Sequence, residues 1–337
     1  MVKKKKVAVV GVGAVGVEMV RLLEKREFPL RSLTIFARSE RKVEIDGFTF
    51  LVKVATPESF KGMDFVFFAG TEGAKGASQT FGQAAINSGC IVIDNGDDFR
   101  MDPRVPLVIP EINPEALAGH HGLIANPNCS TIIALMALAP LHKVAKIRRV
   151  VMSTYQAVSG TGAPAIGELE KQVGAWARKR RLCNSVYPHQ IAFNVLPSIG
   201  SFKGNSGEST EEVKMRVETH KILDDTSIRI NSTCVRVPVF NGHSISMNVE
   251  FVKRITPEQA RDILSKTNGV KVIDDPANNI YPMPISASGK CDVEVGRIRA
   301  DQTVRSGLSL WCSGDNIWKG AAQNAIQIAE CLLSKSK

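Results

Sequence analysis

The first residue with clear chemical potential is a cysteine at the start of an apolar segment. Cys129 lies in NPNCST (126–131) and is followed directly by IIALMALAPL, a run that predicts a helix. Near a helix N-terminus the dipole lowers the pKa of a thiol and favours the nucleophilic thiolate. This segment alone is equally consistent with a nucleophile and with a packed structural cysteine.

A second candidate is an arginine–histidine pair in CVRVPVFNGHS (234–244). If residues 234–239 form a strand, Arg236 and His243 flank a turn. Histidine titrates near neutral pH and can activate a thiol or shuttle a proton, whereas arginine suits a substrate carboxylate. A surface ion pair for Arg236 and an ordinary turn histidine for His243 fit these residues equally well.

A glycine-rich segment near the N-terminus has the features of a dinucleotide site. Residues 7–10 (VAVV) have the composition of a buried strand, run into GVGAVG (11–16), and precede a helical pattern over 17–25. The glycines allow close backbone approach to a pyrophosphate, and the helix N-terminus offers free N–H groups and a positive dipole. A tight structural turn is the alternative, but the β-α-β context favours a cofactor.

The end of the second expected strand, 33–37, indicates which dinucleotide would bind. NAD enzymes usually place an acidic residue there to hold the ribose 2′-hydroxyl. This chain has ARSERK at 37–42, so the Arg38 guanidinium and the Ser39 hydroxyl suit a 2′-phosphate. Glu40 is one acid among three bases. The sequence therefore predicts NADP.

Composition sets limits on the other partners. The 337 residues include 43 basic and 33 acidic ones, a net charge of +10, with 44% hydrophobic residues, which is an ordinary globular composition long enough for two domains. Basic clusters could indicate nucleic acid, but no recognisable nucleic-acid module surrounds them. A positive field equally steers small anions to a cleft, so no nucleic-acid partner is expected.

The chain also gives expectations about compartment and metals. Its apolar runs are too short to cross a bilayer, and MVKKKK lacks the apolar stretch of a signal peptide. A cytoplasmic protein without a membrane partner is expected, with the lysine run a solvated start to the first strand. The seven cysteines are odd in number and lack a CxxC pair, so we expect neither a disulfide framework nor a structural zinc site.

The alternation of elements predicts an α/β fold in two parts. Short apolar strands separated by helix-like stretches such as 74–88 predict a Rossmann-like, doubly wound parallel sheet. These strands are expected at 7–10, 33–37, 65–69, 91–94 and 107–110. Strand-like segments of a second, α+β domain with a mixed, largely antiparallel sheet follow at 150–156, 227–239, 245–253 and 293–300. A terminal helix is expected over 319–333.

Taken together, these motifs resemble the aspartate-semialdehyde dehydrogenases, nearly end to end. NPNCST is similar to that family's nucleophile segment, YQAVSG (155–160) to its glutamine motif, and CVRVPVFNGHS to its arginine–histidine motif, with the same separation of the two residues. EEVK (211–214) and GDN followed by KGAA (314–322) also fit. Several independent motifs in the right order make the resemblance specific.

The resemblance implies a role for each matching residue. Cys129 would be the nucleophile that attacks L-aspartyl 4-phosphate, His243 the acid/base, and Gln156 the residue that orients the acyl intermediate. Substrate would be bound by Arg236 at the α-carboxylate, by Glu211 at the ammonium group, and by Lys214, Arg100 and Asn128 at the phosphate. NADP would be held by Gly11, Gly13, Val15, Gly16, Arg38, Ser39, Ser159, Gly160 and Asn316.

In the implied reaction, attack by Cys129 forms a thioester and releases phosphate. The thioester then accepts a hydride from NADPH, and L-aspartate 4-semialdehyde is released. That step belongs to lysine, threonine, methionine, isoleucine and diaminopimelate biosynthesis. The family's architecture implies an NADP-binding domain over 1–128, completed by 315–337, and a catalytic and dimerisation domain over 129–314. It also implies a homodimer or homotetramer.

Two departures and three rivals accompany this interpretation. The glycine loop is GxGxxG where the family usually has GxxGxxG, and Trp318 replaces a common basic residue; both bear on cofactor contacts. N-acetyl-glutamyl-phosphate reductase and glyceraldehyde-3-phosphate dehydrogenase share the chemistry, but their cysteine motifs differ, and a blocked amine gives Glu211 nothing to bind. A non-catalytic NADP-binding regulator is disfavoured because Cys129, Gln156, Arg236 and His243 are all present.

Overall fold

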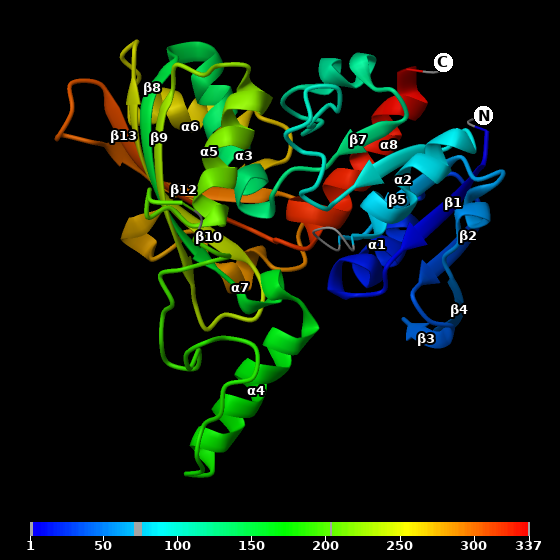
Figure 1. Ribbon diagram of the computed structural model, residues 1–337. Helices are drawn as coiled ribbons and strands as arrows, with labels where there is room; N and C mark the ends of the chain where they lie inside the picture. The colour runs from blue at the N-terminus through cyan, green and yellow to red at the C-terminus, as the bar shows by residue number, and fades with distance from the viewer. Residues whose placement is uncertain (1–2, 71–75, 203, 336–337) are drawn as a thin grey trace. The chain divides into compact units, whose positions relative to one another are not determined.

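The chain forms two compact units in a computed structural model that describes residues 3–70, 76–202 and 204–335 (Figure 1). The first unit comprises the described parts of Met1–Asn128 and Ala321–Lys337, and the second is Cys129–Gly320. No helix in these described ranges is long and apolar enough to cross a bilayer.

The first unit is built on a seven-stranded sheet in the order β3-β4-β2-β1-β5-β6-β7. All neighbouring strands pair in parallel except the β3–β4 hairpin. The strands are β1 (Lys5–Val10), β2 (Leu30–Ala37), β3 (Arg41–Ile45), β4 (Phe48–Val54), β5 (Phe65–Phe68), β6 (Ile91–Asp94) and β7 (Leu123–Ala125). The helices are α1 (Ala14–Lys25), α2 (Ala77–Asn87) and α8 (Gln323–Lys335), with short 3₁₀ turns η1 (Pro57–Phe60) and η2 (Pro114–Gly119). The predicted Rossmann-like parallel sheet is confirmed.

One strand expected in this unit is wrong. Residues 107–110 make only an isolated bridge, from Leu107 to Ala125, and belong to no strand. Pro106 precedes the segment and Pro110 is its last residue, and neither has an N–H to extend a ladder. The Asn113 side chain also donates to the Leu107 carbonyl and accepts from the Ile109 N–H, both at 2.9 Å, so local contacts satisfy this backbone. Residues 74–75, the first two of the helix expected over 74–88, lie outside the described residues.

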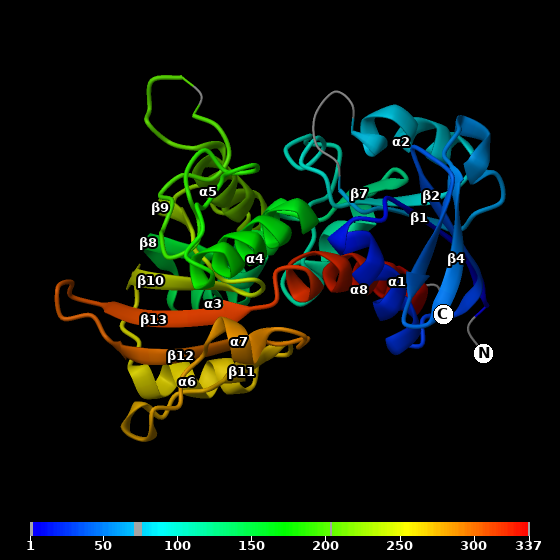
Figure 2. The same cartoon turned by 90° about the horizontal axis from the view of Figure 1, so that it is seen from below.

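The second unit is built on a six-stranded mixed sheet in the order β11-β12-β13-β10-β8-β9 (Figure 2). Its strands are β8 (Ile147–Gln156), β9 (Arg229–Arg236), β10 (His243–Phe251), β11 (Val270–Val272), β12 (Val293–Ala300) and β13 (Gly307–Gly314). Its helices are α3 (Cys129–Ala145), α4 (Ala163–Ala177), α5 (Thr210–Leu223), α6 (Pro257–Ser265) and α7 (Pro284–Ala287), with turns η3 (Val158–Thr161) and η4 (Pro276–Asn278) and the π-helix η5 (Trp318–Ala322). The mixed, largely antiparallel sheet is confirmed, although β8–β9 and β11–β12 pair in parallel.

The register of this sheet gathers the ends of four strands at one edge. Gln156, the last residue of β8, pairs with Arg236, the last residue of β9. His243 opens β10 and pairs with Gly314, which closes β13. Parallel partners end together, and an antiparallel strand begins where its neighbour ends. Residues far apart in sequence therefore meet at this edge.

Candidate active site

The candidate nucleophile begins a helix, as the sequence predicts. Cys129 is the first residue of α3 and is half-buried, while the residues that follow it are buried in the core. The other thiols differ, because burial raises the pKa of Cys90 to about 11 and also raises the pKa values of Cys234 and Cys312. Those three stay protonated and act as small apolar groups, whereas Cys129 has a helix N-terminus to favour its thiolate.

Gln156 and Glu211 meet beside the end of β8. The Gln156 side-chain amide donates to Glu211 Oε1 at 3.2 Å and to Thr154 Oγ1 at 3.3 Å. Both Gln156 and Glu211 are almost fully buried. Glu211 lies in the first turn of α5, where the capping box between Ser209 and Glu212 fixes the helix start. A carboxylate at this depth is costly without a partner, so the pair suits recognition of a cationic or hydrogen-bonding substrate group.

Arg236 is also buried, with 6% of its surface exposed. Its Nη1 donates to the Ala157 carbonyl at 2.7 Å. Its backbone exchanges two hydrogen bonds with Leu196, at 2.8 and 2.9 Å. A guanidinium held in this way presents its remaining donors in a fixed plane, which is the geometry that a carboxylate accepts in bidentate fashion.

His243 is fully buried and adjoins Arg236. Burial lowers the pKa of His243 well below its ordinary value of 6.5, and the Arg236 charge lowers it further. The ring Nδ1 accepts the Ala157 N–H at 3.1 Å. A neutral ring in this orientation carries its proton on Nε2, which has no hydrogen-bond partner among the described residues. Nε2 is therefore the nitrogen available to a substrate.

The turn η3 packs directly against these two side chains. A Cβ added to Gly160 would lie 2.9 Å from Arg236 Nη1 and 3.3 Å from His243 Nε2, so no side chain fits there. Ser159 accepts a hydrogen bond from Asn316 Nδ2 at 3.0 Å, and Asn316 Oδ1 accepts the Gly242 N–H at 2.9 Å. The structure thus brings together Ser159, Gly160 and Asn316, three residues predicted to contact the cofactor.

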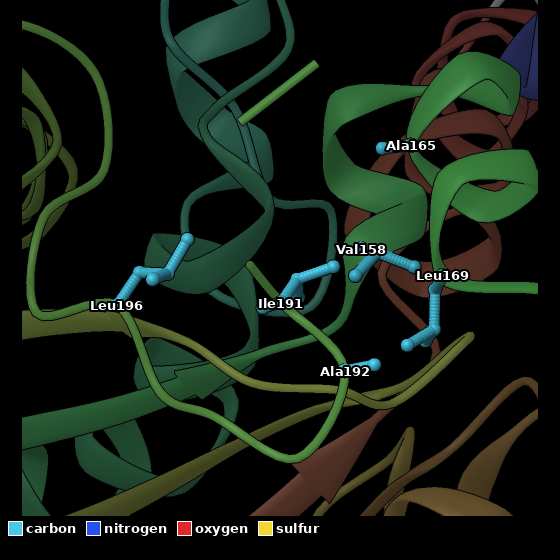
Figure 3. Close-up of a cluster of buried hydrophobic side chains, with 6 residues drawn as sticks. All are labelled: Val158, Ala165, Leu169, Ile191, Ala192 and Leu196. Atoms are coloured by element: carbon cyan, nitrogen blue, oxygen red, sulfur yellow. The ribbon is translucent and has the colours of Figure 1, made fainter. Parts of the chain in front are cut away.

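A hydrophobic cluster supports this turn from α4 and the loop after it (Figure 3). Its buried members are Val158, Ala165, Leu169, Ile191, Ala192 and Leu196. Val158 is the first residue of η3, and Leu196 holds the backbone of Arg236. Packing of this cluster therefore fixes both the glycine turn and the end of β9.

Lys214 lies three residues after Glu211 on α5 and is half-buried. Residues at this spacing share one helix face, so the cation and the carboxylate are neighbours on α5. Glu212, between them in sequence, accepts the Cys234 N–H at 3.0 Å and so attaches α5 to β9. That attachment holds the two charged residues beside the site.

In the first unit, the glycine loop has the shape of a pyrophosphate-binding turn. Gly11 has φ +107°, which favours glycine, and follows β1 directly. A Cβ at Gly16 would lie 2.0 Å from the Gly11 carbonyl oxygen, so α1 approaches the loop closely only because Gly16 lacks a side chain. Gly13, the N-cap of α1, has no atom of the described residues within 4 Å of its Cβ position. Open space at a helix N-terminus fits a phosphate group.

The neighbouring strand end carries the predicted NADP residues. Arg38 and Ser39 are exposed and follow β2, which pairs in parallel with β1. Arg41 donates to Ser39 Oγ at 3.1 Å, so a second guanidinium joins the predicted pair. Val15 is half-buried in the first turn of α1. The loop and this cationic group lie at the same edge of the sheet, because parallel strands end together.

The two remaining predicted residues also belong to the first unit. Arg100 is 6% exposed, and its Nη2 donates to the Asn95 carbonyl at 2.8 Å. Asn128 is 7% exposed and directly precedes Cys129 in the chain. The predicted residues therefore form two groups, one in the first unit and one in the second.

Sequence reasoning missed two polar residues that organise the second group. Asp315 is buried, and its Oδ2 accepts hydrogen bonds from Asn241 Nδ2 and from the Gly289 N–H, both at 2.7 Å. Asn241 also accepts the Ser159 hydroxyl at 3.0 Å. Both residues lie in motifs named above: Asn241 directly precedes Gly242, and Asp315 directly precedes Asn316. Nothing in the sequence indicates that the two side chains contact each other.

Comparison with known proteins finds semialdehyde dehydrogenases along nearly the whole chain. The family described as semialdehyde dehydrogenase, NAD binding domain, matches residues 6–120, and the semialdehyde dehydrogenase dimerisation domain matches residues 138–319. Aspartate-semialdehyde dehydrogenase of Aquifex aeolicus is 49% identical over 339 residues, covering 98% of both chains. The Bacillus subtilis protein of that name is 43% identical and covers 97% of this chain and 96% of its own. The crystal structure of aspartate semialdehyde dehydrogenase II from Vibrio cholerae, also solved as a complex with ASA, superposes with a TM-score of 0.93 at 40% identity, covering 98% of this chain and 99% of that chain.

These matches define an oxidoreductase with a nicotinamide-dinucleotide-binding domain and a semialdehyde dehydrogenase dimerisation domain. The chain belongs to the aspartate-semialdehyde dehydrogenase family. The resemblance drawn from the motifs is confirmed, and the related acyl-phosphate reductases and the non-catalytic regulator are not favoured.

Proposed function

We propose that this chain catalyses the NADP-dependent reductive dephosphorylation of L-aspartyl 4-phosphate to L-aspartate 4-semialdehyde, through a thioester on Cys129. The observation that carries the proposal is the convergence of Gln156, Arg236 and His243 at one edge of the second sheet, in the unit whose helix α3 begins with Cys129. Each side chain is buried and oriented by a named hydrogen bond, as a preorganised site requires.

In the proposed reaction, the Cys129 thiolate attacks the acyl carbon and the acyl–phosphate bond breaks. The phosphate leaves with the bonding electrons and takes up one proton. Lys214, Arg100 and Asn128 would stabilise its charge. When bound, NADPH would provide the hydride that reduces the acyl carbon. His243 would interact with the acyl oxygen through Nε2, since Nδ1 is engaged by Ala157. The thiolate then departs as the aldehyde forms.

Substrate recognition would depend on opposite charges at two points. Arg236 would bind the α-carboxylate, and Glu211 would bind the α-ammonium group while Gln156 orients the acyl intermediate. Analogues that lack either charge would not supply the substrate partner of Arg236 or Glu211, and a well-fitted polar site discriminates against such analogues by about 10⁴-fold. This two-point recognition would select an amino acid over an N-acylated analogue.

NADP would be held by both groups of residues. Gly11, Gly13, Val15 and Gly16 would bind the pyrophosphate, and Arg38 and Ser39 would bind the 2′-phosphate. Ser159, Gly160 and Asn316 would contact the nicotinamide end. The open space at Gly13 and the cations after β2 support this assignment.

We also infer that the chain assembles as a homodimer or homotetramer. Helices α3, α5 and α6 pack on the second sheet, whereas Val151, Ser153 and Tyr155 of β8 alternate with buried residues and remain partly exposed. Tyr155 packs against Trp311 with 5.2 Å between ring centroids and a tilt of 41°, so this sheet face carries aromatic surface suited to association.

The experiment that tests the function is phosphate-dependent reduction of NADP with L-aspartate 4-semialdehyde. Parallel assays use N-acetyl-glutamate semialdehyde, glyceraldehyde 3-phosphate and NAD. We expect activity with the aspartate aldehyde and NADP, dependent on added phosphate. Activity with another aldehyde would move the substrate assignment, and folded protein without activity on any of them would contradict the enzymatic proposal.

A further inference from the structure

Gly320 lies so close to Cys129 that no side chain fits between them. A Cβ at Gly320 would be 2.9 Å from Cys129 Cβ and 3.3 Å from its Cα. The backbone φ of Gly320 is not positive, so any residue could adopt this conformation. The requirement for glycine is therefore spatial: the backbone at Gly320 forms a wall against the cysteine.

The position of that wall is set by Asp315. The Gly320 N–H donates to the Asp315 carbonyl at 3.0 Å, a bond that spans five residues and belongs to the π-turn of η5. The Asp315 carboxylate fixes the same turn, because Oδ1 accepts the N–H groups of Ile317 and Trp318, both at 2.8 Å. With 1% of Asp315 exposed, these bonds lie in a dry interior and hold the turn firmly.

The other carboxylate oxygen of Asp315 reaches the turn that carries His243. Oδ2 accepts from Asn241 Nδ2 and from the Gly289 N–H, both at 2.7 Å. Asn241 is two residues before His243, and Gly242 between them has φ +88° and donates its N–H to Asn316 Oδ1. One buried anion therefore connects the turn before His243 to the turn that contacts Cys129.

We propose that Asp315 and Gly320 are positioning residues that fix the position of the Cys129 thiol relative to His243. Asp315 fixes both turns, and Gly320 transmits the position of one of them to the Cα–Cβ bond of Cys129. This inference rests on the proposed function, since it takes Cys129 as the nucleophile. Small displacements matter there, because a shift of about 1 Å in a reacting group can cost about 10²-fold in rate.

The first test compares Gly320→Ala with Gly167→Ala. Gly167 lies in α4 of the same unit, and no atom within residues 3–70, 76–202 and 204–335 lies within 4 Å of its Cβ position, so it is a matched control. We expect Gly320→Ala to lower kcat about tenfold or more, with KM for the aldehyde changed by less than about threefold. Gly167→Ala should match the wild type. A wild-type kcat for Gly320→Ala would overturn the proposal.

A second readout does not require turnover. The rate of iodoacetamide alkylation of Cys129 is measured against pH by peptide mass spectrometry, with the buried Cys234 and Cys312 as internal references. Gly320→Ala should shift the Cys129 profile and leave the references unreactive. The two proposals can fail separately. A wild type without aldehyde activity would contradict the proposed function, whereas an alkylation profile that Gly320→Ala does not shift would contradict the positioning role.

The connection to His243 is tested by exchanging partners. Asp315→Asn can keep the two Oδ1 bonds but places an amide group against Asn241, so kcat should fall. Adding Asn241→Asp supplies an acceptor for that amide and should restore part of kcat. Asn241→Asp alone places a second carboxylate against that of Asp315, so its kcat should stay low. A double variant no better than Asp315→Asn contradicts the connection. If Asp315→Asn does not fold, the Gly320 comparison decides the proposal.

Discussion

The glycine loop of the first unit and the buried site residues of the second differ in how they present groups suited to a ligand. Around Gly13 and Arg38, the groups suited to phosphate are backbone N–H groups and exposed cations, placed within one β-α-β unit. Around Arg236 and His243, the predicted substrate contacts are buried side chains supplied by strands and helices distant in sequence. Exposed charges act by attraction that water screens, whereas buried ones act by fixed geometry. The second region should therefore tolerate change less.

The largest expected effect is at the cysteine. Cys129→Ala removes the nucleophile and should lower kcat by about 10⁴-fold or more, because no thioester can form. NADP binding, measured by fluorescence titration, should stay within about twofold of the wild type, since its predicted phosphate contacts lie in the first unit. Cys183→Ala, at an exposed cysteine, serves as the control. Normal turnover by Cys129→Ala would end the nucleophile assignment.

The next effect tests fixed geometry in the buried region. Arg236→Lys keeps the charge but loses the planar pair of donors, so kcat/KM for the aldehyde should fall about 10- to 100-fold. The loss should appear mainly in KM, with a small change in thermal midpoint, because a lysine can still donate to the Ala157 carbonyl. An unchanged saturation curve would remove Arg236 from substrate binding.

The exposed region should respond through charge. Arg38→Asp places a carboxylate where the 2′-phosphate is expected, so the ratio of NADP to NAD efficiency should fall about tenfold or more. High salt should reduce the effect, since this group is exposed. Lys53→Asp, on exposed β4, gives a charge-matched control. A ratio that does not change would place the 2′-phosphate elsewhere.

Substitutions at two glycines of the loop should distinguish effects on NADP binding from effects on stability. Gly16→Ala forces a methyl group against the Gly11 carbonyl and should lower the free energy of unfolding by about 1–3 kcal/mol. In Gly13→Ala the added methyl group meets no atom of the part of the chain that the structure describes within 4 Å. This variant should change the free energy of unfolding by less than about 1 kcal/mol, yet weaken NADP binding. Urea unfolding and NADP titration of both variants provide the measurement. Equal stability losses would refute the distinction.

The smallest effect concerns a buried charge away from the chemistry. Glu168 on α4 accepts the N–H groups of Ser185 and Val186; burial alone would raise its pKa, but these bonds outweigh it and lower the pKa below its ordinary value of 4.5. A lowered pKa contributes stability above that value, which is lost as pH falls through the folded-state pKa. Glu168→Gln should therefore cost about 1–3 kcal/mol at pH 7 and progressively less below about pH 4.5. A cost that does not vary with pH would contradict this assignment.

The sequence predicts the glycine loop from local patterns, but it is less informative about the buried residues around Arg236 and His243. The glycine loop and Cys129 at a helix start depend on neighbouring residues alone. The β3–β4 hairpin was missed although Asp46-Gly47, both at positive φ, is a strong signal for a two-residue hairpin turn. The bonds of Asp315 to Asn241 and Gly289 depend on strand register across more than twenty residues, which periodicity does not specify. Only the family resemblance anticipated which residues gather there.

The path of the chain through the first unit also affects how this protein is made. α8 packs against α1 and β6, and Arg26 forms a two-point ion pair with Glu330 at 2.6 and 2.9 Å, so the first unit is completed by residues from the far end of the sequence. The ribosome must synthesise all of Cys129–Gly320 before α8 emerges, which takes roughly 10 to 40 s. During that interval the partner surface of α1 is exposed. In a nascent chain of this protein the second unit can therefore complete its fold before the first unit has its last helix.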